Sequence, residues 1–134
     1  YFTYGMHWCL NVVTGRLGEP SAVLLRAGEI ISGLDLARSR RPGIPDRDLA
    51  RGPARMTRSL GVDGRYNGLD LLAGTPELVL ESAPAAPTLV RTGPRVGVAG
   101  AGASTPWRFW LDGEPTVSVY RPAVQRRRTT GTKT

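Results

Sequence analysis

The sequence predicts a single domain of mixed α/β structure, and three observations support this prediction. The chain has 134 residues, a length that suits one domain with one modest core. Its 17 glycines and 11 prolines favour many turns and short elements over a helix bundle. Segments rich in aromatic and β-branched residues, which are typical of strands, occur together with segments whose apolar residues recur at helical spacing.

The first part of the chain predicts β-strands. Residues 2–13 are rich in aromatic and β-branched side chains, and we expect residues 4–6 (Tyr-Gly-Met) to form a bend between two strands. A turn-forming stretch then separates these residues from a strand at residues 21–26. The prediction is therefore a hairpin in which residues 7–13 pair with residues 21–26.

Two helical regions follow. Apolar residues at helical spacing predict a helix over about residues 28–39, which a stretch containing proline and glycine ends. A second helical region is expected over residues 46–60. Pro53 suits a first helical turn and divides this region into a short and a longer helix, and Gly61 caps its end.

The remainder of the chain predicts short strands separated by turns. A strand is expected at residues 77–81, and a strand pair over residues 90–98 around a Gly-Pro turn. An Asp-Gly turn predicts a hairpin between residues 106–111 and 116–120. Residues 123–134 lack large apolar side chains except for one valine and are rich in arginine and threonine, so they predict a disordered basic tail.

The balance of charges favours an anionic partner. The net charge is +7, and 17 of the 18 basic residues are arginine because the only lysine is Lys133. Such a balance most often indicates nucleic acid, since neutralising phosphates releases counterions. The alternative is genome composition, in which codon bias replaces lysine with arginine without functional meaning.

Composition also excludes some classes of protein. With one cysteine, Cys9, and one histidine, His7, the chain can form neither an internal disulfide nor a structural zinc site built from cysteine and histidine. This usage fits a reducing compartment. No apolar run is long enough to span a membrane.

Several separate stretches follow, in order, the motifs of one enzyme family. They are YFTYGMHWCLN at residues 1–11, VLLRA at 23–27, DLARGPARM at 48–56, and RVGV with WRFW in the segment 95–119. The first resembles a DNA-inserting hairpin, and the third resembles a D/E-L-x-x-G-P-x-[RK]-[LM] motif. Over about residues 1–122 the chain therefore resembles the alkyladenine (3-methyladenine) DNA glycosylase family.

The resemblance implies both a fold and an activity. Residues 1–122 would form the C-terminal part of a glycosylase catalytic domain, with a curved, mostly antiparallel sheet closing into a partial barrel, flanking helices and a protruding hairpin. A monofunctional member flips alkylated purines out of duplex DNA and hydrolyses the N-glycosidic bond, leaving an abasic site. The implied protein is a bacterial-type, cytoplasmic, nucleoid-associated monomer, with no cofactor or metal and with double-stranded DNA containing a damaged purine as partner.

The resemblance also gives roles to residues near the N-terminus. Tyr4 resembles the residue that wedges into the duplex in place of the flipped nucleotide, because a planar ring recovers part of the lost stacking. Met6 and His7 would lie at the hairpin tip against the groove. Tyr1 resembles an aromatic that stacks on the extruded base. Asn11 resembles the pocket residue that discriminates against guanine.

Further positions match the family's reaction and phosphate contacts. Arg26 resembles the arginine beside the nucleophilic water and the sugar, and Val96 would offer its backbone carbonyl to that water. Arg51 and Arg55, together with Arg58, would hold phosphates. The family's catalytic glutamate lies in a segment resembling E-x-E-A-Y before the hairpin, and no such segment occurs here. We therefore expect that the chain lacks the N-terminal part and is by itself inactive or weakly active.

The core contains no lysine, so Schiff-base lyase chemistry is not expected, and this fits a water nucleophile.

Two alternatives remain open, one for the single residues and one for the whole chain. Ordinary structural roles are the alternative for each residue: sheet surface for the tyrosines, a turn for Asn11, an ion pair for Arg26 and a solvated face for the helix arginines. The alternative function is a non-catalytic nucleic-acid-binding β-barrel or an inactive fragment.

Overall fold

A computed structural model describes residues 1–73, 77–82 and 89–124. It shows a small mixed α/β fold, as the sequence predicts, with three α-helices and three two-stranded antiparallel sheets among these residues. The chain divides into two compact units, each described here by itself. Unit 1 consists of Tyr1–Ala86 with Pro115–Ser118, and unit 2 of Pro87–Glu114 with Val119–Thr134.

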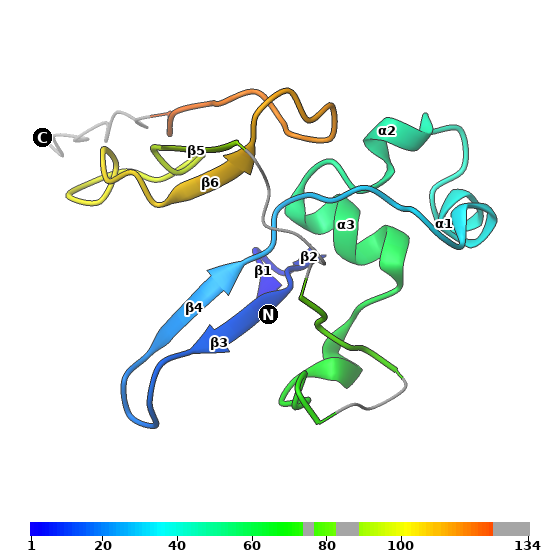
Figure 1. The fold of residues 1–134 in the computed structure, drawn as a ribbon, viewed down its shortest axis with the longest axis horizontal. Coiled ribbons are helices and arrows are strands. Elements are labelled where there is room, and N and C mark those ends of the chain that lie inside the picture. Colours follow the sequence, from blue (N-terminus) through cyan, green and yellow to red (C-terminus); the bar gives the residue numbers. More distant parts are fainter. Residues whose placement is uncertain (74–76, 83–88, 125–134) are drawn as a thin grey trace, which may run out of the picture. The chain divides into compact units, whose positions relative to one another are not determined.

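The strands of unit 1 form two hairpins. In the first, β1 (Phe2–Thr3) pairs with β2 (His7–Trp8), which confirms the predicted bend at residues 4–6. In the second, β3 (Asn11–Thr14) pairs with β4 (Ser21–Leu24). These two strands form the long arm in Figure 1. The prediction that residues 7–13 pair with 21–26 is therefore wrong for residues 7 and 8, because the tight bend folds them back onto β1.

The helices of unit 1 follow the predicted order with one shifted boundary. Helix α1 (Leu34–Arg40) begins six residues later than expected, because Gly33 adopts a left-handed conformation with φ of 69° that the helix cannot include. Helix α2 (Asp46–Leu49) and helix α3 (Pro53–Leu60) divide at the predicted place, with Pro53 as the first residue of α3. Gly61, with φ of 73°, ends α3 as predicted.

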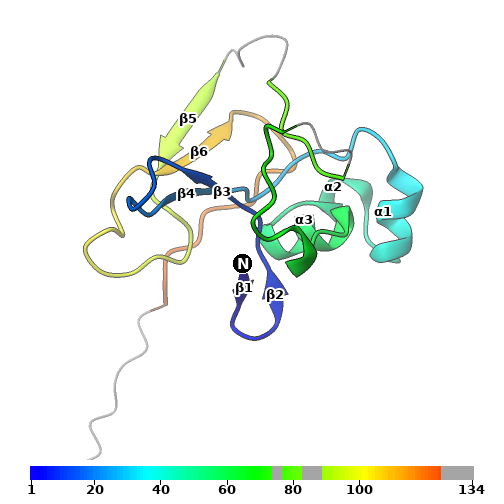
Figure 2. The same cartoon turned by 90° about the horizontal axis from the view of Figure 1, so that it is seen from below.

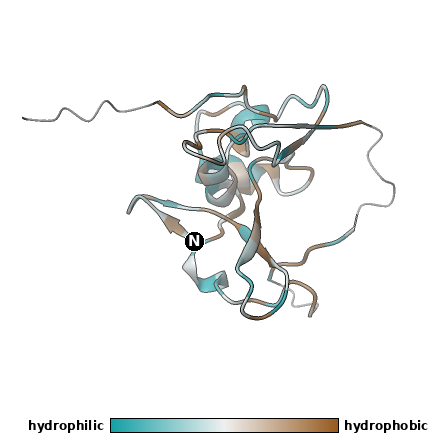
Figure 3. Ribbon diagram, turned by 90° about the vertical axis from the view of Figure 1, so that its left-hand side faces the viewer, coloured by the Kyte–Doolittle hydropathy of each residue, from teal (hydrophilic) through white to brown (hydrophobic). Residues whose placement is uncertain are grey.

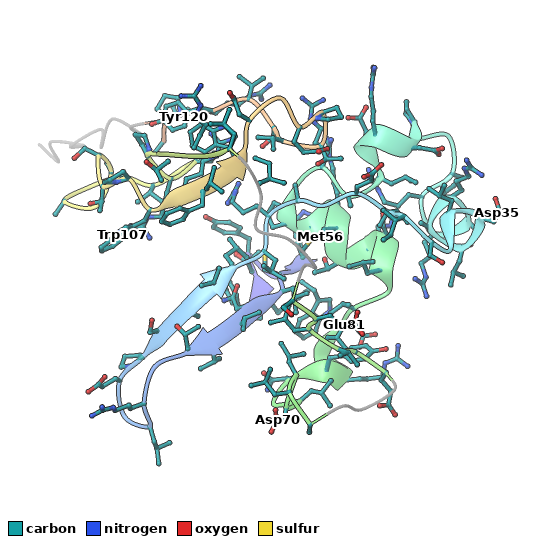
Figure 4. The ribbon with its side chains drawn as sticks, viewed as in Figure 1. Asp35, Met56, Asp70, Glu81, Trp107 and Tyr120 are labelled. Atoms are coloured by element: carbon teal, nitrogen blue, oxygen red, sulfur yellow. The ribbon has the colours of Figure 1, made fainter. Side chains whose placement is uncertain are left out.

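The small core of unit 1 lies around the helices. Five apolar side chains are buried among the described residues: Cys9, Ala37, Leu49, Ala50 and Met56, the last labelled on α3 in Figure 4. Hydrogen bonds connect the helices around this core. Ser59 Oγ donates to the Leu49 carbonyl at 2.6 Å, and Arg40 Nη1 donates to the Ser59 carbonyl at 2.9 Å.

Unit 2 contains one sheet, in which β5 (Val90–Gly93) pairs with β6 (Arg108–Leu111). The pairing differs from two predictions. The strand pair within residues 90–98 does not form, because β5 pairs with β6 instead. The hairpin of residues 106–111 with 116–120 does not form either, since the carbonyl of Val117 instead accepts a hydrogen bond from Arg51 Nη2 at 3.3 Å in unit 1.

Three further predictions concern the rest of the chain. Residues 77–82 form no strand; with described partners, their backbone makes one hydrogen bond, from Leu80 N to the Leu71 carbonyl at 3.5 Å, which is too little to define a ladder. The described sheets form no closed barrel, so the partial barrel is not confirmed. Most of the predicted tail, residues 125–134, lies outside the described residues.

Candidate functional site

The bend between β1 and β2 has an unusual backbone. Tyr4 has φ of 52° and Gly5 has φ of 66°, and Met6 N donates to the Thr3 carbonyl at 3.1 Å. Positive φ at both central residues is typical of a type I′ turn, whose twist matches that of a hairpin. Among the described residues, Tyr4 is the one non-glycine residue with positive φ. A left-handed conformation costs a tyrosine about 1–2 kcal/mol, and such strain clusters at functional sites.

This bend also presents its side chains to solvent. The Tyr4 side chain is 89% exposed, Met6 is 67% exposed, and His7 is exposed as well. Figure 2 shows the loop between β1 and β2 projecting from the rest of unit 1. The turn therefore exposes a large aromatic ring and adopts a backbone conformation that is unfavourable for tyrosine. No packing of the ring within the protein offsets this cost, which suggests that the ring contacts a partner.

The base of this hairpin is anchored to the helices. The rings of Phe2 and Trp8 face each other across the strands with centroids 4.8 Å apart. Thr57 Oγ1 on α3 donates to the Trp8 carbonyl at 2.9 Å. A Cβ added to Gly64, in the 3₁₀ helix η1 (Gly64–Tyr66), would lie 2.7 Å from the Trp8 ring, so this glycine leaves room for the indole. In Figure 3 the strand beside the N mark carries hydrophobic colouring, in keeping with this packing role.

The hydrogen bond between Thr57 and Trp8 leads to a prediction. The Thr57→Val variant keeps the shape of the side chain but leaves the Trp8 carbonyl without this donor. We expect a loss of about 1–3 kcal/mol in the free energy of unfolding, measured by urea denaturation. The matched control is Thr14→Val, which removes an exposed hydroxyl bonded to Ser21 Oγ. A loss no larger than that of the control would contradict the anchoring role.

Backbone hydrogen bonds place two predicted site residues, Tyr1 and Asn11, in the neighbouring hairpins of unit 1. Cys9 N donates to the Tyr1 carbonyl at 2.8 Å, and Tyr1 N bonds to the Cys9 carbonyl in return. In the next hairpin Asn11 pairs with Leu24, and Leu25 N donates to the Leu10 carbonyl at 3.0 Å. Arg26 is the residue that follows Leu25 in the chain.

Asn11 contains an unpaired polar atom. Its side-chain Oδ1 is buried and has no hydrogen-bond partner among the described residues. Buried polar atoms in proteins are nearly always paired, so an exception calls for an explanation. Arg26 is half-buried and interacts with its surroundings. Asn11 therefore holds one buried acceptor without a partner among the described residues.

The arginines predicted to bind phosphate differ from each other. Arg51 is half-buried, with Nη1 3.2 Å from Asp48 Oδ1 and Nη2 3.3 Å from the Val117 carbonyl. Its guanidinium is therefore already engaged within unit 1. Arg55 lies on the exposed face of α3 and forms no ion pair within the described part of the chain. Of the two, Arg55 is the one available to an external anion.

Val96 belongs to unit 2, where it is half-buried in the loop after β5. The following residue is fixed, because Gly97 N donates to the Arg121 carbonyl at 3.0 Å. The preceding residue is also held, since the Arg95 guanidinium lies 5.2 Å from the Trp107 ring centroid, within cation–π range. The Val96 backbone is thus held on both sides.

Sequence reasoning missed two supporting residues. Thr57 anchors the hairpin, but a threonine inside a helix gives no signal of its partner on a distant strand. Arg41 donates through Nη1 to the carbonyls of Asp48 and Leu49 and so stabilises the end of α2. The Arg-Arg pair before Pro42 indicated only a helix end, because a local signal does not show that Arg41 would reach the carbonyls of the next helix.

Two properties of the described residues bear on other classes of function. No three histidine, cysteine, aspartate or glutamate side chains there lie together in a way that could hold a metal ion. Within the same residues, every helix is too short or too polar to cross a membrane.

Comparison with known proteins gives consistent matches. A family model described as methylpurine-DNA glycosylase (MPG) matches residues 1–115. A protein of Streptomyces avermitilis named as a 3-methyladenine DNA glycosylase is 53% identical over 133 residues, covering 97% of this chain and 62% of the relative. Relatives with the same name from Leifsonia xyli and Frankia casuarinae are 54% and 46% identical, covering 90% and 95% of this chain and 59% and 64% of their own lengths. The chain therefore spans about three fifths of the length of these relatives.

Proposed function

Because the chain belongs to the methylpurine-DNA glycosylase family, we propose that it is part of a DNA-repair glycosylase. In this proposal the protein flips an alkylated purine out of duplex DNA and hydrolyses its N-glycosidic bond, leaving an abasic site. It acts as a monomer in the bacterial cytoplasm, in association with the nucleoid. The partial barrel, with residues 1–122 as one piece of the catalytic domain, belongs to the same proposal.

The observation that carries the proposal is the exposed ring of Tyr4 in a strained turn on an anchored hairpin. Extruding a nucleotide leaves a gap in the stack, and base–aromatic stacking is worth about 1–3 kcal/mol per base. The backbone that carries the ring is already ordered in the turn, so less conformational freedom is lost when the ring fills the gap. Met6 and His7, which flank the turn, would contact the groove.

The pocket for the flipped base would lie by the strands behind the hairpin. Tyr1 would stack on the base, since electron-poor alkylated purines favour an aromatic face. Asn11 would place its side-chain amide near the purine edge, where the extra amino group of guanine would be excluded sterically and by unmatched donors. Arg26 would hold the nucleophilic water beside the sugar. Arg55 would hold a backbone phosphate, with Arg51 supporting the same region.

The chemistry that remains is hydrolysis by water. The transition state has a positively charged, sugar-like character, which a carboxylate normally stabilises while activating the water. In this proposal the carboxylate belongs to a segment resembling the family's glutamate motif, and that motif does not occur among these 134 residues. The only lysine is Lys133, so an amine nucleophile from the core is not part of the proposal.

A base-release assay tests the activity. The substrate is a duplex with one alkylated adenine, and the chain is compared with a version extended at its N-terminus to the length of its relatives. We expect base release by the extended form and little or none by the chain alone. Release by neither form, with DNA binding retained, would reject the glycosylase and favour a non-catalytic nucleic-acid-binding module.

A further inference from the structure

The hairpin of β1 and β2 has little stiffness of its own. Its two strands contain two residue pairs, Phe2 with Trp8 and Thr3 with His7. A single two-stranded hairpin is at best marginally stable in water, so the direction of its bend depends on what holds its base. The base is therefore the place where the protein can fix the orientation of Tyr4.

Thr57 connects this base to α3 and to the chain that leads into η1. Its hydroxyl donates to the Trp8 carbonyl at 2.9 Å, and its own carbonyl accepts a hydrogen bond from Val62 N at 2.8 Å as the chain leaves α3. The Asp63 side chain then accepts a hydrogen bond from Arg65 N at 3.0 Å and so caps η1. Hydrogen bonds thus hold η1 in a defined place relative to α3 and to the hairpin base.

The indole of Trp8 lies directly against the backbone of η1 at Gly64. A Cβ built on Gly64 would lie 2.7 Å from Cη2 and 2.9 Å from Cζ2 of the ring, closer than real Cβ atoms approach other atoms. Gly64 does not have a positive φ, so its backbone conformation is open to alanine and does not by itself require glycine. Within the described structure, the indole is therefore the feature that requires glycine at this position.

We propose that Gly64 and Trp8 are positioning residues for Tyr4. Because no side chain separates the indole from the η1 backbone, the size of residue 64 sets the tilt of β2, and this tilt sets the direction in which the bend presents the Tyr4 ring. A ring can replace a base in the stack only when it enters in the correct orientation. The inference rests on the proposed function and adds the contact that makes the hairpin selective for a duplex with a gap in its stack.

A size exchange between the two positions tests the proposal. Gly64→Ala pushes the indole away, Trp8→Phe leaves a gap beside Gly64, and the double variant Trp8→Phe/Gly64→Ala restores the contact because a smaller ring meets a larger residue. The measured quantity is the ratio of affinities for a duplex with a tetrahydrofuran abasic-site analogue and for an undamaged duplex. We expect each single variant to lower this ratio by about tenfold, since a misplacement of about 1 Å is costly, and the double variant to restore most of it.

Gly28→Ala is the matched control. Gly28 also lies in unit 1 without a positive φ, and a Cβ there would have nothing within 4 Å, so the ratio should not change. Proton–nitrogen NMR spectra of the free protein report on the hairpin without DNA. The Trp8 indole resonance is the one missing in Trp8→Phe. Gly64→Ala should shift it together with the amide resonances of residues 4–6, and Gly28→Ala should leave them in place.

The remaining outcomes also decide the question. A ratio that is unchanged in both single variants, that falls as far in Gly28→Ala, or that falls further in the double variant would overturn the positioning role, because structural defects add and do not cancel. If Gly64→Ala does not fold, Trp8→Phe and the double variant still decide, since the alanine must raise the ratio in the Trp8→Phe background.

Failure of the proposed function gives a different result. Equal affinity of the wild-type chain for the two duplexes would reject the proposed function. Shifted resonances of residues 4–6 in Gly64→Ala, with their return in the double variant, would still support the control of the bend by residue 64.

Discussion

Replacing Tyr4 with alanine is expected to reduce affinity for a duplex containing an abasic-site analogue by about 5- to 150-fold, which corresponds to the loss of one stacking partner worth about 1–3 kcal/mol. The ring is 89% exposed, so its removal takes away no packing within the protein. Stability should therefore not fall, and alanine keeps the Cβ atom that causes the strain at a positive φ, so that strain stays nearly unchanged. Fluorescence anisotropy with labelled duplexes measures the affinity, and urea denaturation measures the stability.

Two comparisons separate stacking from general contact. Tyr4→Phe keeps the ring and should retain most of the affinity, because stacking needs the aromatic face rather than the hydroxyl. Tyr120→Ala makes the same substitution at a partly exposed tyrosine of unit 2, labelled in Figure 4, and should have little effect. If Tyr4→Ala weakens binding to single strands as much as binding to the abasic duplex, Tyr4 does not fill a gap in a duplex.

Local signals in the sequence predicted the elements of unit 1 best. The bend at Tyr4 and Gly5, the division before Pro53 and the cap at Gly61 all depend on residues whose backbone preferences are strong and local. The late start of α1 shows the limit of apolar spacing, because Ile30 and Ile31 continue the helical pattern while Gly33 interrupts it.

Strand partners could not be predicted in the same way. Residues 90–93 and 108–111 each form a strand, yet their partners are each other and not their neighbours in sequence. The sequence signal for a strand describes a half-buried surface, and it contains little information about which other strand will cover its edge. The hydrogen bond from Arg51 to the Val117 carbonyl spans 66 residues and leaves no local trace.

The candidate site shows the same division between local and distant information. The resemblance of residues 1–11 directed attention to Tyr4, whose exposure and backbone conformation agree with an outward-facing role. The same resemblance could not show that Arg51 is engaged by Asp48 and Val117 while Arg55 is available. Which arginine on a basic helix can meet a phosphate depends on the neighbouring carboxylates and carbonyls, and these are set by tertiary packing.

Replacing Leu49 with alanine is expected to destabilise the protein by about 2–5 kcal/mol, the usual range when a buried leucine is truncated in a core that relaxes only partly. Leu49 is 0% exposed, and its carbonyl accepts hydrogen bonds from Ser59 and Arg41, so the backbone cannot move easily to fill the cavity. Small domains have about 5–15 kcal/mol of stability in total, so this loss is a large fraction. The urea midpoint should fall by about 1–2 M.

Leu36→Ala is the matched control, because Leu36 also lies in a helix but is 55% exposed. Its effect should stay within about 0.5 kcal/mol. Leu49→Ala should also weaken DNA binding, but only by reducing the folded fraction, since the leucine side chain has no access to a ligand. A stabilising osmolyte should therefore restore DNA affinity in Leu49→Ala and leave Tyr4→Ala unimproved. Failure of the osmolyte to restore binding in Leu49→Ala would mean that the helix core positions the DNA-binding groups as well as stabilising the fold.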